Sequence, residues 1–340
     1  MATGGNEILI IGGYGHVGSQ IAARLLKTTD RPVRIAGRSP DRLHQAAARL
    51  GCESAVLDIA APDTWPQALD RAAYVIVCVD QVTTAFARAV LERGLMYADI
   101  TADDDFLRRM EQLDGLARAS GGSAVLSVGL APGLTNLLAS KGTAGLDRVD
   151  SVRIGILLGL GDSHGAAAID WTLRNFRKVR RRKTDPIPFG TPPRAHPVIP
   201  FDFADQHVLR RTLGIAQVHT FITFDTPLLS RLSFPLLSGI AASPMLSRLL
   251  KAIMLRTSFG SDRTALSIRV EGVEDGRRLA RILTMEGRQE ARITALVTAL
   301  LVEHALARGI PAGVHHIDQV LSIDDLAPDL SVDAGLVFDW

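Results

Sequence analysis

The chain has 340 residues, 47% of them apolar and 22% charged, and its formal net charge at pH 7 is only +2. This composition is typical of a globular protein and excludes the disordered, collagenous and disulfide-scaffold classes. The small net charge gives no field strong enough to indicate a nucleic-acid or anionic-membrane partner. At about 150 residues per domain, the length predicts two domains, or one large core with a second lobe.

The two cysteines, Cys52 and Cys78, do not form a CxxC pair. We therefore expect neither a disulfide framework nor a cysteine zinc site. The first residues lack the charged segment and cleavage site of a secretory signal, and they lead directly into a glycine motif. These features predict a cytoplasmic protein.

Short β-branched runs alternate with Ala/Leu/Arg-rich helical stretches over the first 140 residues. This alternation predicts an α/β fold with a doubly wound, mostly parallel sheet. Val17, Ile21 and Leu25 recur at helical spacing and predict a helix that packs on the sheet, and a second helix is expected at Thr83–Glu92. The expected strands are Ile8–Ile11, Val33–Ala36, Ala55–Leu57, Tyr74–Val79, Tyr97–Ile100 and Ala124–Val128.

A different pattern follows Gly145 and predicts a second lobe. We interpret this lobe as an α+β substrate or dimerisation domain. Its expected elements, in chain order, are a strand, a helix, a proline-rich stretch, and two strands that flank an apolar helical region: Val152–Leu158, Ala166–Phe176, Asp185–Phe201, Val218–Phe224, Pro227–Leu255 and Ala265–Val270.

The sequence predicts a helix that begins near Gln289 and is rich in Ala and Leu, like the helical stretches of the first 140 residues. If this helix returns to the first sheet, the second lobe is an insertion rather than a tail. The predicted domains are therefore residues 1–145 for dinucleotide binding, 146–288 for substrate and dimerisation, and 289–340 as a C-terminal helix and tail.

The most informative segment is the glycine motif GxGxxG, which lies directly between the first expected strand and helix. Its first glycine permits the tight turn, its second lets the backbone approach a pyrophosphate, and its third lets helix and strand pack closely. The helix N-terminus offers N–H groups to the phosphates. The motif predicts a Rossmann-type dinucleotide site, and the alternative is that the glycines only make a tight connection. The expected binding residues are Gly13, Tyr14, Gly15, His16, Val17 and Gly18.

The end of the second strand indicates which dinucleotide binds. A domain that prefers NAD normally carries Asp or Glu about 20 residues after the glycines, where it holds the ribose 2′-OH. Here the segment Ile35–Arg42, IAGRSPDR, has no carboxylate at the strand end. Arg38 can pair instead with a 2′-phosphate, and Ser39 and Arg42 can add donors. We therefore predict NADP(H) over NAD(H), with a solvated arginine in a polar loop as the alternative.

Residues at the ends of the third and fourth strands are further cofactor candidates. Asp58 stands where Rossmann proteins often contact adenine, although capping of the following segment explains it as well. Cys78, Val79 and Asp80 end the fourth strand at the edge where ligands lie in open α/β folds. A small core residue is the alternative for Cys78, and a cap of the next helix is the alternative for Asp80.

Three further segments, together with the glycine motif and IAGR, resemble the saccharopine dehydrogenase-like family, in particular its NADP-dependent saccharopine reductase branch. The resemblance covers the first 140 residues well and the last 50 loosely. It implies a Rossmann domain, a mixed second domain inserted before the C-terminal helix, a homodimer, and reversible reduction of an imine to a secondary amine by nicotinamide hydride. The three segments are Ala87–Thr101, Val128–Ala139 and Gly313–Leu326.

The resemblance also assigns residues to the nicotinamide end of the site. It implies that Pro132 and Gly133 shape the backbone beside the nicotinamide. It likewise implies that Tyr97, Asp99 and Thr101 lie at a strand end facing the cleft. Asp99 and Tyr97 are therefore catalytic candidates, although core packing explains Tyr97 equally well.

The chain departs from the saccharopine reductases at two positions. Those enzymes carry an aspartate where this chain has Ala131, and the cysteine expected after the first strand of their second domain is missing from Leu157–Gly165. Saccharopine itself is therefore not the expected substrate. His164 is the acid/base candidate, because an imidazole titrates near neutral pH, with a helix-capping or solvent-exposed histidine as the alternative. Asp205 and His207 are second candidates.

Other signals are explained by ordinary structure. The basic run Arg177–Lys183 is interpreted as a solvated helix end, because no aromatic residues interleave it. Prolines and basic residues interrupt the apolar segment Phe234–Leu255, so we expect no integral membrane span. His315 and His316 adjoin Asp318, but neighbours in sequence rarely converge on one metal, and we assign no metal.

The leading hypothesis is an NADP(H)-dependent oxidoreductase that acts on the imine or secondary amine of a small amino-acid-like substrate. One alternative resembles the trans-acting enoyl reductases, which transfer hydride to a C=C bond of a lipid. Another is a non-catalytic NADP-binding sensor or scaffold protein.

Overall fold

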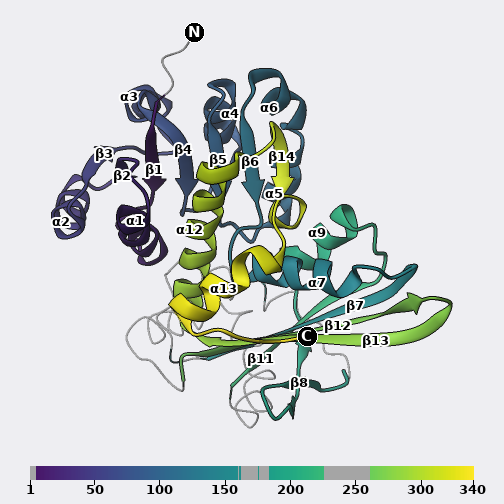
Figure 1. The fold of residues 1–340 in the computed structure, drawn as a ribbon. Helices are drawn as coiled ribbons and strands as arrows, with labels where there is room; N and C mark the ends of the chain where they lie inside the picture. Colours follow the sequence, from purple (N-terminus) through teal and green to yellow (C-terminus); the bar gives the residue numbers. More distant parts are fainter. Residues whose placement is uncertain (1–4, 160, 162–174, 176–183, 226–260) are drawn as a thin grey trace. The chain divides into compact units, whose positions relative to one another are not determined.

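The computed structural model describes residues 5–159, 161, 175, 184–225 and 261–340. The chain forms two compact units, each made from two stretches of sequence (Figure 1). The first unit comprises Met1–Gly133 and Thr294–Leu321, and the second comprises Leu134–Ile293 and Ser322–Trp340. These boundaries, at residues 133/134, 293/294 and 321/322, differ from the predicted domain boundaries after residues 145 and 288. Residues 322–340 belong to the second unit, not to the first.

A seven-stranded parallel sheet forms the centre of the first unit. Its strands are β1 (Glu7–Ile11), β2 (Val33–Gly37), β3 (Glu53–Val56), β4 (Ala72–Val77), β5 (Met96–Asp99), β6 (Ser123–Leu126) and β14 (Gly313–His316). Their order across the sheet is β14-β6-β5-β4-β1-β2-β3. The order reverses between β1 and β4, which is where open α/β sheets bind ligands at the carboxyl ends of their strands. The predicted Rossmann-type fold is confirmed.

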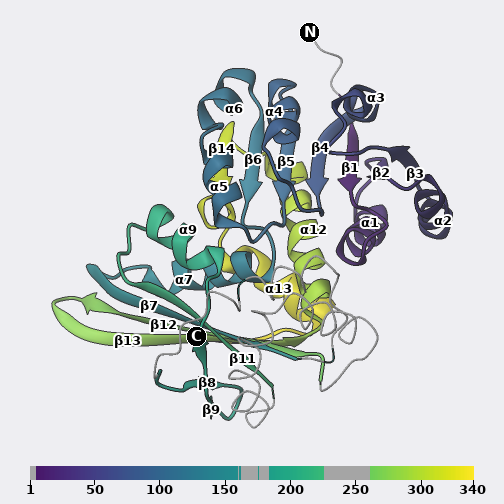
Figure 2. The same ribbon diagram turned by 180° about the vertical axis from the view of Figure 1, so that it is seen from behind.

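Helices cover both faces of this sheet (Figures 1 and 2). Strand β1 is buried along its whole length, as expected for a parallel strand covered on two sides. The helices with residues in the first unit are α1 (His16–Thr28), α2 (Pro40–Leu50), α3 (Trp65–Leu69), α4 (Ala85–Glu92), α5 (Asp104–Glu111), α6 (Asp114–Ser120) and most of α12 (Glu290–Arg308).

A six-stranded mixed sheet forms the second unit, with the order β10-β11-β7-β12-β13-β15. Strand β7 pairs in parallel with β11 and antiparallel with β12, and α7 packs against both β7 and β12. The strands of this sheet are β7 (Arg148–Leu158), β10 (Ile199–Pro200), β11 (Val218–Phe224), β12 (Arg263–Glu274), β13 (Arg277–Arg288) and β15 (Val337–Asp339). Strands β8 (Ile187–Phe189) and β9 (Arg194–His196) form a separate two-stranded sheet. The described helices of the unit are α7 (Thr135–Thr143), α9 (Ala204–Thr212) and α13 (Ile323–Ala334).

Strands β12 and β13 form a hairpin that the sequence analysis missed. Asp275 and Gly276 connect them with φ values of 49° and 72°, which a two-residue hairpin turn requires. An Asp-Gly pair between two strand-like runs is a recognised signal for such a turn. The expected helices at Ala166–Phe176 and Pro227–Leu255 and the basic run Arg177–Lys183 fall on segments outside the described residues, apart from Asn175.

Within the part of the chain that the structure describes, no helix is long and apolar enough to cross a membrane.

Candidate functional site

The glycine motif forms the turn between β1 and α1 at the carboxyl edge of the first sheet. A Cβ atom on Gly18 would lie 2.5 Å from the carbonyl oxygen of Gly12, and one on Gly13 would lie 2.5 Å from the Cβ of Ile35. Both distances are too short for any side chain, so helix α1 and strand β2 approach the turn as closely as glycine allows. At Gly15 the nearest described atom, the Gly12 carbonyl oxygen, would lie 3.0 Å from a Cβ. This shape fits a pyrophosphate held against bare main chain.

Helix α1 points its N-terminus into this turn. Its N-cap residue, Gly15, makes no side-chain capping bond, and the first turn carries no acidic residue. The first N–H groups of a helix have no partner within the helix, and the helix dipole places partial positive charge there. The motif predicts that the backbone N–H groups of His16, Val17 and Gly18, at this end of the helix, bind an anion, and this stays a prediction.

An aromatic and basic cluster surrounds the end of β2. A Cβ on Gly37 would lie 2.4 Å from Cε1 of Tyr14, so the tyrosine ring packs directly on the backbone of the strand end. The guanidinium carbon of Arg42 lies 4.5 Å from the centroid of that ring, within cation–π range. Arg38 and Arg42 are exposed, and the side chain of Ser39 makes no capping bond although Ser39 is the N-cap of α2.

One carboxylate lies close in sequence to these arginines. Asp41 stands in the first turn of α2, between Arg38 and Arg42 in the chain. It is exposed. The strand end itself, Gly37, is followed directly by Arg38, so the position that binds a ribose 2′-OH in NAD-preferring domains holds a cation here.

Asp58 is partly engaged in local structure. Its Oδ1 accepts a hydrogen bond of 2.9 Å from the backbone N–H of Ala60, and its carbonyl oxygen accepts one of 3.0 Å from Nε1 of Trp65. These bonds close the turn that follows β3. Asp58 therefore closes a local turn but does not cap the following helix, whose N-cap is Ala61. The contact of Asp58 with adenine stays a prediction.

Residues 78–80 continue past β4 toward the glycine turn. The Cys78 N–H donates to the carbonyl oxygen of Ile11 at 3.0 Å. The Cγ1 atom of Val79 would lie 2.7 Å from a Cβ on Gly12, and the Val79 side chain is 39% exposed. Burial, with a smaller contribution from the Asp99 carboxylate, raises the pKa of the Cys78 thiol. A thiol that stays protonated is a poor nucleophile, which argues against a catalytic thiol, but Cys78 is only partly buried and so is not a full core residue.

Tyr97, Asp99 and Gln81 form a buried polar cluster at the ends of β4 and β5. The Tyr97 hydroxyl donates to Oδ2 of Asp99, and Nε2 of Gln81 donates to both the Tyr97 hydroxyl oxygen and Asp99 Oδ2 at 2.6 Å. The N–H of Thr101 donates to Oδ1 of Asp99 at 2.7 Å. Tyr97 is 0% exposed and Asp99 1% exposed. The sequence analysis named the first two residues and missed Gln81, which directly follows Asp80 past the same strand end.

The burial of this cluster changes how its groups titrate. Burial, opposed in part by hydrogen bonds from Tyr97 and Thr101, raises the pKa of Asp99 from 3.8 to about 7, and the Asp80 carboxylate adds to the rise. Burial next to Asp99 raises the pKa of the Tyr97 hydroxyl as well. Asp99 can therefore hold or release a proton near neutral pH, whereas an ordinary aspartate is already ionised there.

Strand β6 runs into the turn that contains Pro132 and Gly133. Gly129 and Gly133 take φ values of 155° and 141°, which disfavour any other residue. The N–H of Leu130 donates to Oγ1 of Thr294 at 3.3 Å. The first unit ends at Gly133, so this turn is the last part of the first stretch of that unit.

The second unit contains one buried carboxyl group among the predicted candidates. Asp205 is 0% exposed, and its Oδ1 accepts from the Thr220 hydroxyl at 2.6 Å and from the Gln206 N–H at 2.7 Å. Burial raises its pKa. His207 instead forms a partly exposed pair with Asp202, with 2.6 Å between His207 Nε2 and Asp202 Oδ1. The predicted acid/base residue, His164, lies outside the described residues.

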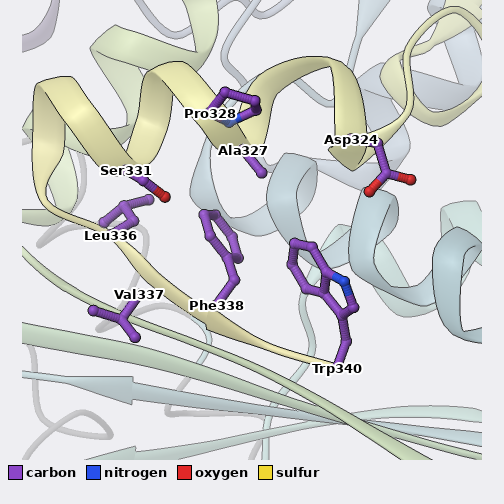
Figure 3. Close-up of a pocket in the computed structure, with 8 residues that line it drawn as sticks. All are labelled: Asp324, Ala327, Pro328, Ser331, Leu336, Val337, Phe338 and Trp340. Carbon is purple, nitrogen blue, oxygen red and sulfur yellow. The ribbon is translucent and has the colours of Figure 1, made fainter.

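A shallow groove of about 500 Å³ lies in the second unit between α13 and β15 (Figure 3). None of the predicted site residues lines it. Lys141 lies beside the groove, with Nζ 4.7 Å from the ring centroid of Trp340. No group of three His, Cys, Asp or Glu side chains within the described ranges is arranged to hold a metal ion. The lining residues are Asp324, Ala327, Pro328, Ser331, Leu336, Val337, Phe338 and Trp340.

Comparison with known proteins agrees with this geometry. Residues 8–125 match the family model of the saccharopine dehydrogenase NADP binding domain. No curated protein matches the chain in sequence.

Several solved structures share the fold. Apo saccharopine dehydrogenase (L-Glu forming) from Saccharomyces cerevisiae is 13% identical, with a TM-score of 0.65 over 98% of this chain and 99% of that one. C. glutamicum DAP dehydrogenase in complex with DAP is 15% identical, with a TM-score of 0.50 over 98% and 99%. An engineered D-amino acid dehydrogenase bound to NADP+ is 16% identical, with a TM-score of 0.50 over 96% and 99%. Residues 8–125 are therefore similar to the NADP binding domain of saccharopine dehydrogenases, and the whole chain shares its fold with the yeast enzyme.

Proposed function

We propose that this protein is an NADP(H)-dependent oxidoreductase that reduces the imine of a small amino-acid-like substrate, or oxidises the matching secondary amine. The observation that carries the proposal is the combination of a bare glycine turn at the start of α1 with Arg38, in place of a carboxylate, directly after β2. The first feature suits a dinucleotide, and the second suits the form with a 2′-phosphate.

The adenosine end of the proposed site is built from charge and stacking. The Tyr14 ring holds the Arg42 guanidinium over its face at 4.5 Å, so part of the conformational freedom of that arginine is already lost before a phosphate binds. Arg38 supplies a second planar guanidinium one residue past β2, and the Ser39 hydroxyl supplies a further donor. Guanidinium groups pair with phosphate through two parallel hydrogen bonds, which an ammonium group cannot do.

The proposed acid/base group is Asp99, at the carboxyl end of β5. Bound NADPH would supply the hydride that the imine carbon takes up. With a pKa of about 7, Asp99 can give a proton to the imine nitrogen in the reductive direction and take it back in the oxidative direction. Tyr97 and Gln81 hold the Asp99 carboxyl in one orientation.

The family context supports the same class of substrate. The related folds include a DAP dehydrogenase and a D-amino acid dehydrogenase. A protonated imine accepts hydride readily, so the main task of the protein is to position it, and few catalytic groups are needed. Within this proposal we place the protein in the cytoplasm and expect it to form a homodimer.

Calorimetry with the whole chain tests the cofactor first. We expect NADPH to bind more tightly than NADH, because only NADPH carries the phosphate that Arg38 and Arg42 would pair with. Uptake of neither nucleotide would overturn the proposal. Turnover is then followed with a panel of imines, pairs of keto acids and amines, and enoyl thioesters. Turnover of the enoyl substrates alone, or tight binding without any turnover, would reject imine reduction.

A further inference from the structure

Three side chains that the proposed reaction does not use form a hydrogen-bonded chain in the first unit. The Oγ atom of Ser127 lies 2.8 Å from Nδ1 of His316, and Nε2 of the same ring lies 3.0 Å from Oε1 of Glu111. Ser127 is 0% exposed, His316 is 4% exposed, and the Glu111 side chain is 30% exposed. The three residues come from the end of β6, the end of β14 and the end of α5, so only the tertiary fold brings them together.

The Glu111 carboxylate defines the direction of the hydrogen bond at Nε2, and the protonation of the ring then sets the direction of the bond at Nδ1. A carboxylate oxygen only accepts, so the Glu111 contact places a proton on Nε2 of His316. In the neutral ring, Nδ1 is then an acceptor, and the Ser127 hydroxyl donates to it. The backbone N–H of His316 also donates to Oε1 of Gln319 at 2.8 Å. Both ring nitrogens and the backbone N–H of His316 therefore have hydrogen-bond partners, and the Nδ1 bond fixes the orientation of the Ser127 hydroxyl.

Ser127 is one of three described residues other than glycine with a positive φ, at 58°. A side chain in this left-handed region is strained, and such residues persist where their surroundings hold them. The hydrogen bond to His316 supplies that constraint. The Ser127 hydroxyl is fully buried against the imidazole ring. Ser127, His316 and Glu111 therefore do not present a serine nucleophile to a substrate.

The backbone reversal at Ser127 begins the turn that contains Pro132 and Gly133. A Cβ on Gly133 would lie 3.2 Å from the carbonyl oxygen of Ser127, so the turn folds back onto the residue that starts it. On the other side, β14 pairs with β6 in the register His316 to Leu126. A change in the φ angle of Ser127 would therefore shift the Pro132–Gly133 backbone.

We propose that Ser127, His316 and Glu111 form a positioning relay that sets the backbone of the turn at residues 128–133, and through it the seat of the nicotinamide ring. This inference rests on the proposed function, and on the resemblance described above, which implies that the nicotinamide lies beside this turn. None of the three side chains needs to touch the cofactor. The relay acts through the conformation of Ser127, whereas the glycine turn and Arg38 hold the other end of the dinucleotide.

The test uses the fluorescence of NADPH bound to the whole chain, because emission from the reduced nicotinamide depends on the surroundings of that ring. The variants are Ser127→Ala, His316→Leu and Ser127→Gly. His315→Leu is the matched control, because His315 is the neighbouring residue on β14 and its Nε2 contacts the carbonyl oxygen of Pro311 instead. Dissociation constants and urea unfolding are measured on the same samples.

We expect Ser127→Ala and His316→Leu to lose most of the change in nicotinamide emission that wild type produces. Their dissociation constants for NADPH should stay within about threefold of wild type, a change of less than 1 kcal/mol, because the phosphates and adenosine bind elsewhere. Ser127→Gly should lie closer to wild type than Ser127→Ala, because glycine adopts a positive φ without strain. His315→Leu should match wild type.

Two results would overturn the relay. Nicotinamide emission that matches wild type in both Ser127→Ala and His316→Leu, with or without a loss of unfolding free energy, would show that these hydrogen bonds only stabilise the fold. Ser127→Gly behaving no better than Ser127→Ala would show that the φ angle is not what the relay sets. If the wild-type chain binds no NADPH, the proposed function fails together with this inference, and that outcome is distinguishable from the other two.

Discussion

The charged groups that follow β2 differ from the carboxyl group at the end of β5 in their exposure to solvent. Arg38 and Arg42 are exposed, and water screens them until a ligand excludes it. Asp99 is 1% exposed, so the protein interior rather than water sets its pKa. Substitution of the arginines should therefore act on ligand binding, whereas substitution of Asp99 should also act on folding.

Arg38→Ala should weaken NADPH binding by about 10- to 100-fold, since a charged hydrogen bond contributes about 1.5–3 kcal/mol. NADH binding should change little, because NADH lacks the 2′-phosphate. Calorimetric titration of both nucleotides measures the difference. Arg31→Ala is the control, because Arg31 is also exposed but precedes β2 instead of following it. If Arg38→Ala keeps the wild-type preference for NADPH, Arg38 does not read the phosphate.

Asp99→Asn should change how stability depends on pH. Because the pKa of Asp99 is about 7 in the folded state and its ordinary value is 3.8, the folded state binds more protons than the unfolded state between these values. Ionisation of Asp99 therefore lowers the free energy of unfolding as pH rises from about 4 to about 7, by at most about 4 kcal/mol. Asparagine cannot ionise, so the variant should lack this part of the decline.

Urea unfolding of wild type and Asp99→Asn at pH 5 and pH 8 measures the effect. The stability of the variant relative to wild type should be greater at pH 8, and other titrating groups cancel in the difference. An equal pH dependence in the two proteins would mean that Asp99 titrates normally. In the proposed reaction, the same variant should lower the rate of imine reduction by about 100-fold or more, in the range found for acid/base groups.

At the scale of elements, the approach of α1 to its preceding turn determines the shape of the proposed phosphate site. The distance of 2.5 Å between a Gly18 Cβ and the Gly12 carbonyl oxygen leaves no room for a methyl group. The helix would have to move away from the turn, and its N–H groups would move with it. The packing of helix α1 on the turn therefore determines where its N–H groups lie for a ligand.

Gly18→Ala should destabilise the protein by about 1–3 kcal/mol, the usual cost of overpacking, and should abolish measurable NADPH binding. Gly115→Ala is the control, because Gly115 lies in α6 and a Cβ there meets no described atom within 4 Å. That variant should gain about 0.5–1 kcal/mol from helix propensity and bind NADPH normally. Urea unfolding and calorimetry measure both, and equal behaviour of the two variants would contradict the packing argument.

At the scale of the whole molecule, the first unit depends on a segment that returns from the far end of the chain. Strand β14 covers the edge of β6, and the N–H of Val314 donates to Asp114 Oδ1 at 2.9 Å. Glu303 of α12 accepts hydrogen bonds from Nε of Arg24 at 2.9 Å and from the Thr28 hydroxyl at 2.6 Å, both on α1. The first stretch of the unit, residues 1–133, is therefore incomplete without residues 294–321.

A fragment of residues 1–145 should not fold to a monomeric nucleotide-binding domain, although it contains the whole glycine motif. It lacks β14 and α12, so it leaves β6 as an unpaired edge that invites aggregation. Size-exclusion chromatography and urea unfolding compare it with the full chain. A monomeric fragment with a cooperative transition and normal NADPH binding would contradict this expectation.

The local part of the site was predictable because its signals lie close together in sequence. Gly13, Gly15 and Gly18 stand between an apolar strand and an amphipathic helix, and steric exclusion at such a turn depends only on nearby backbone. The same holds for the six strands expected in the first 140 residues, which the structure shows with ends shifted by at most two residues. Strand β14, GVHH, is too short and polar to be predicted alone, since its pairing with β6 makes it a strand.

By itself, the sequence determined the parallel sheet of the first unit, the glycine turn and the basic strand end, because each of these follows from periodicity or from residues within one short segment. Only the tertiary structure decided which distant side chains meet: Gln81 with Tyr97 and Asp99, and Ser127 with His316 and Glu111. It also decided the pKa of Asp99, since burial is a property of the packed molecule. Contacts between residues far apart in the chain leave no local pattern for a sequence to display.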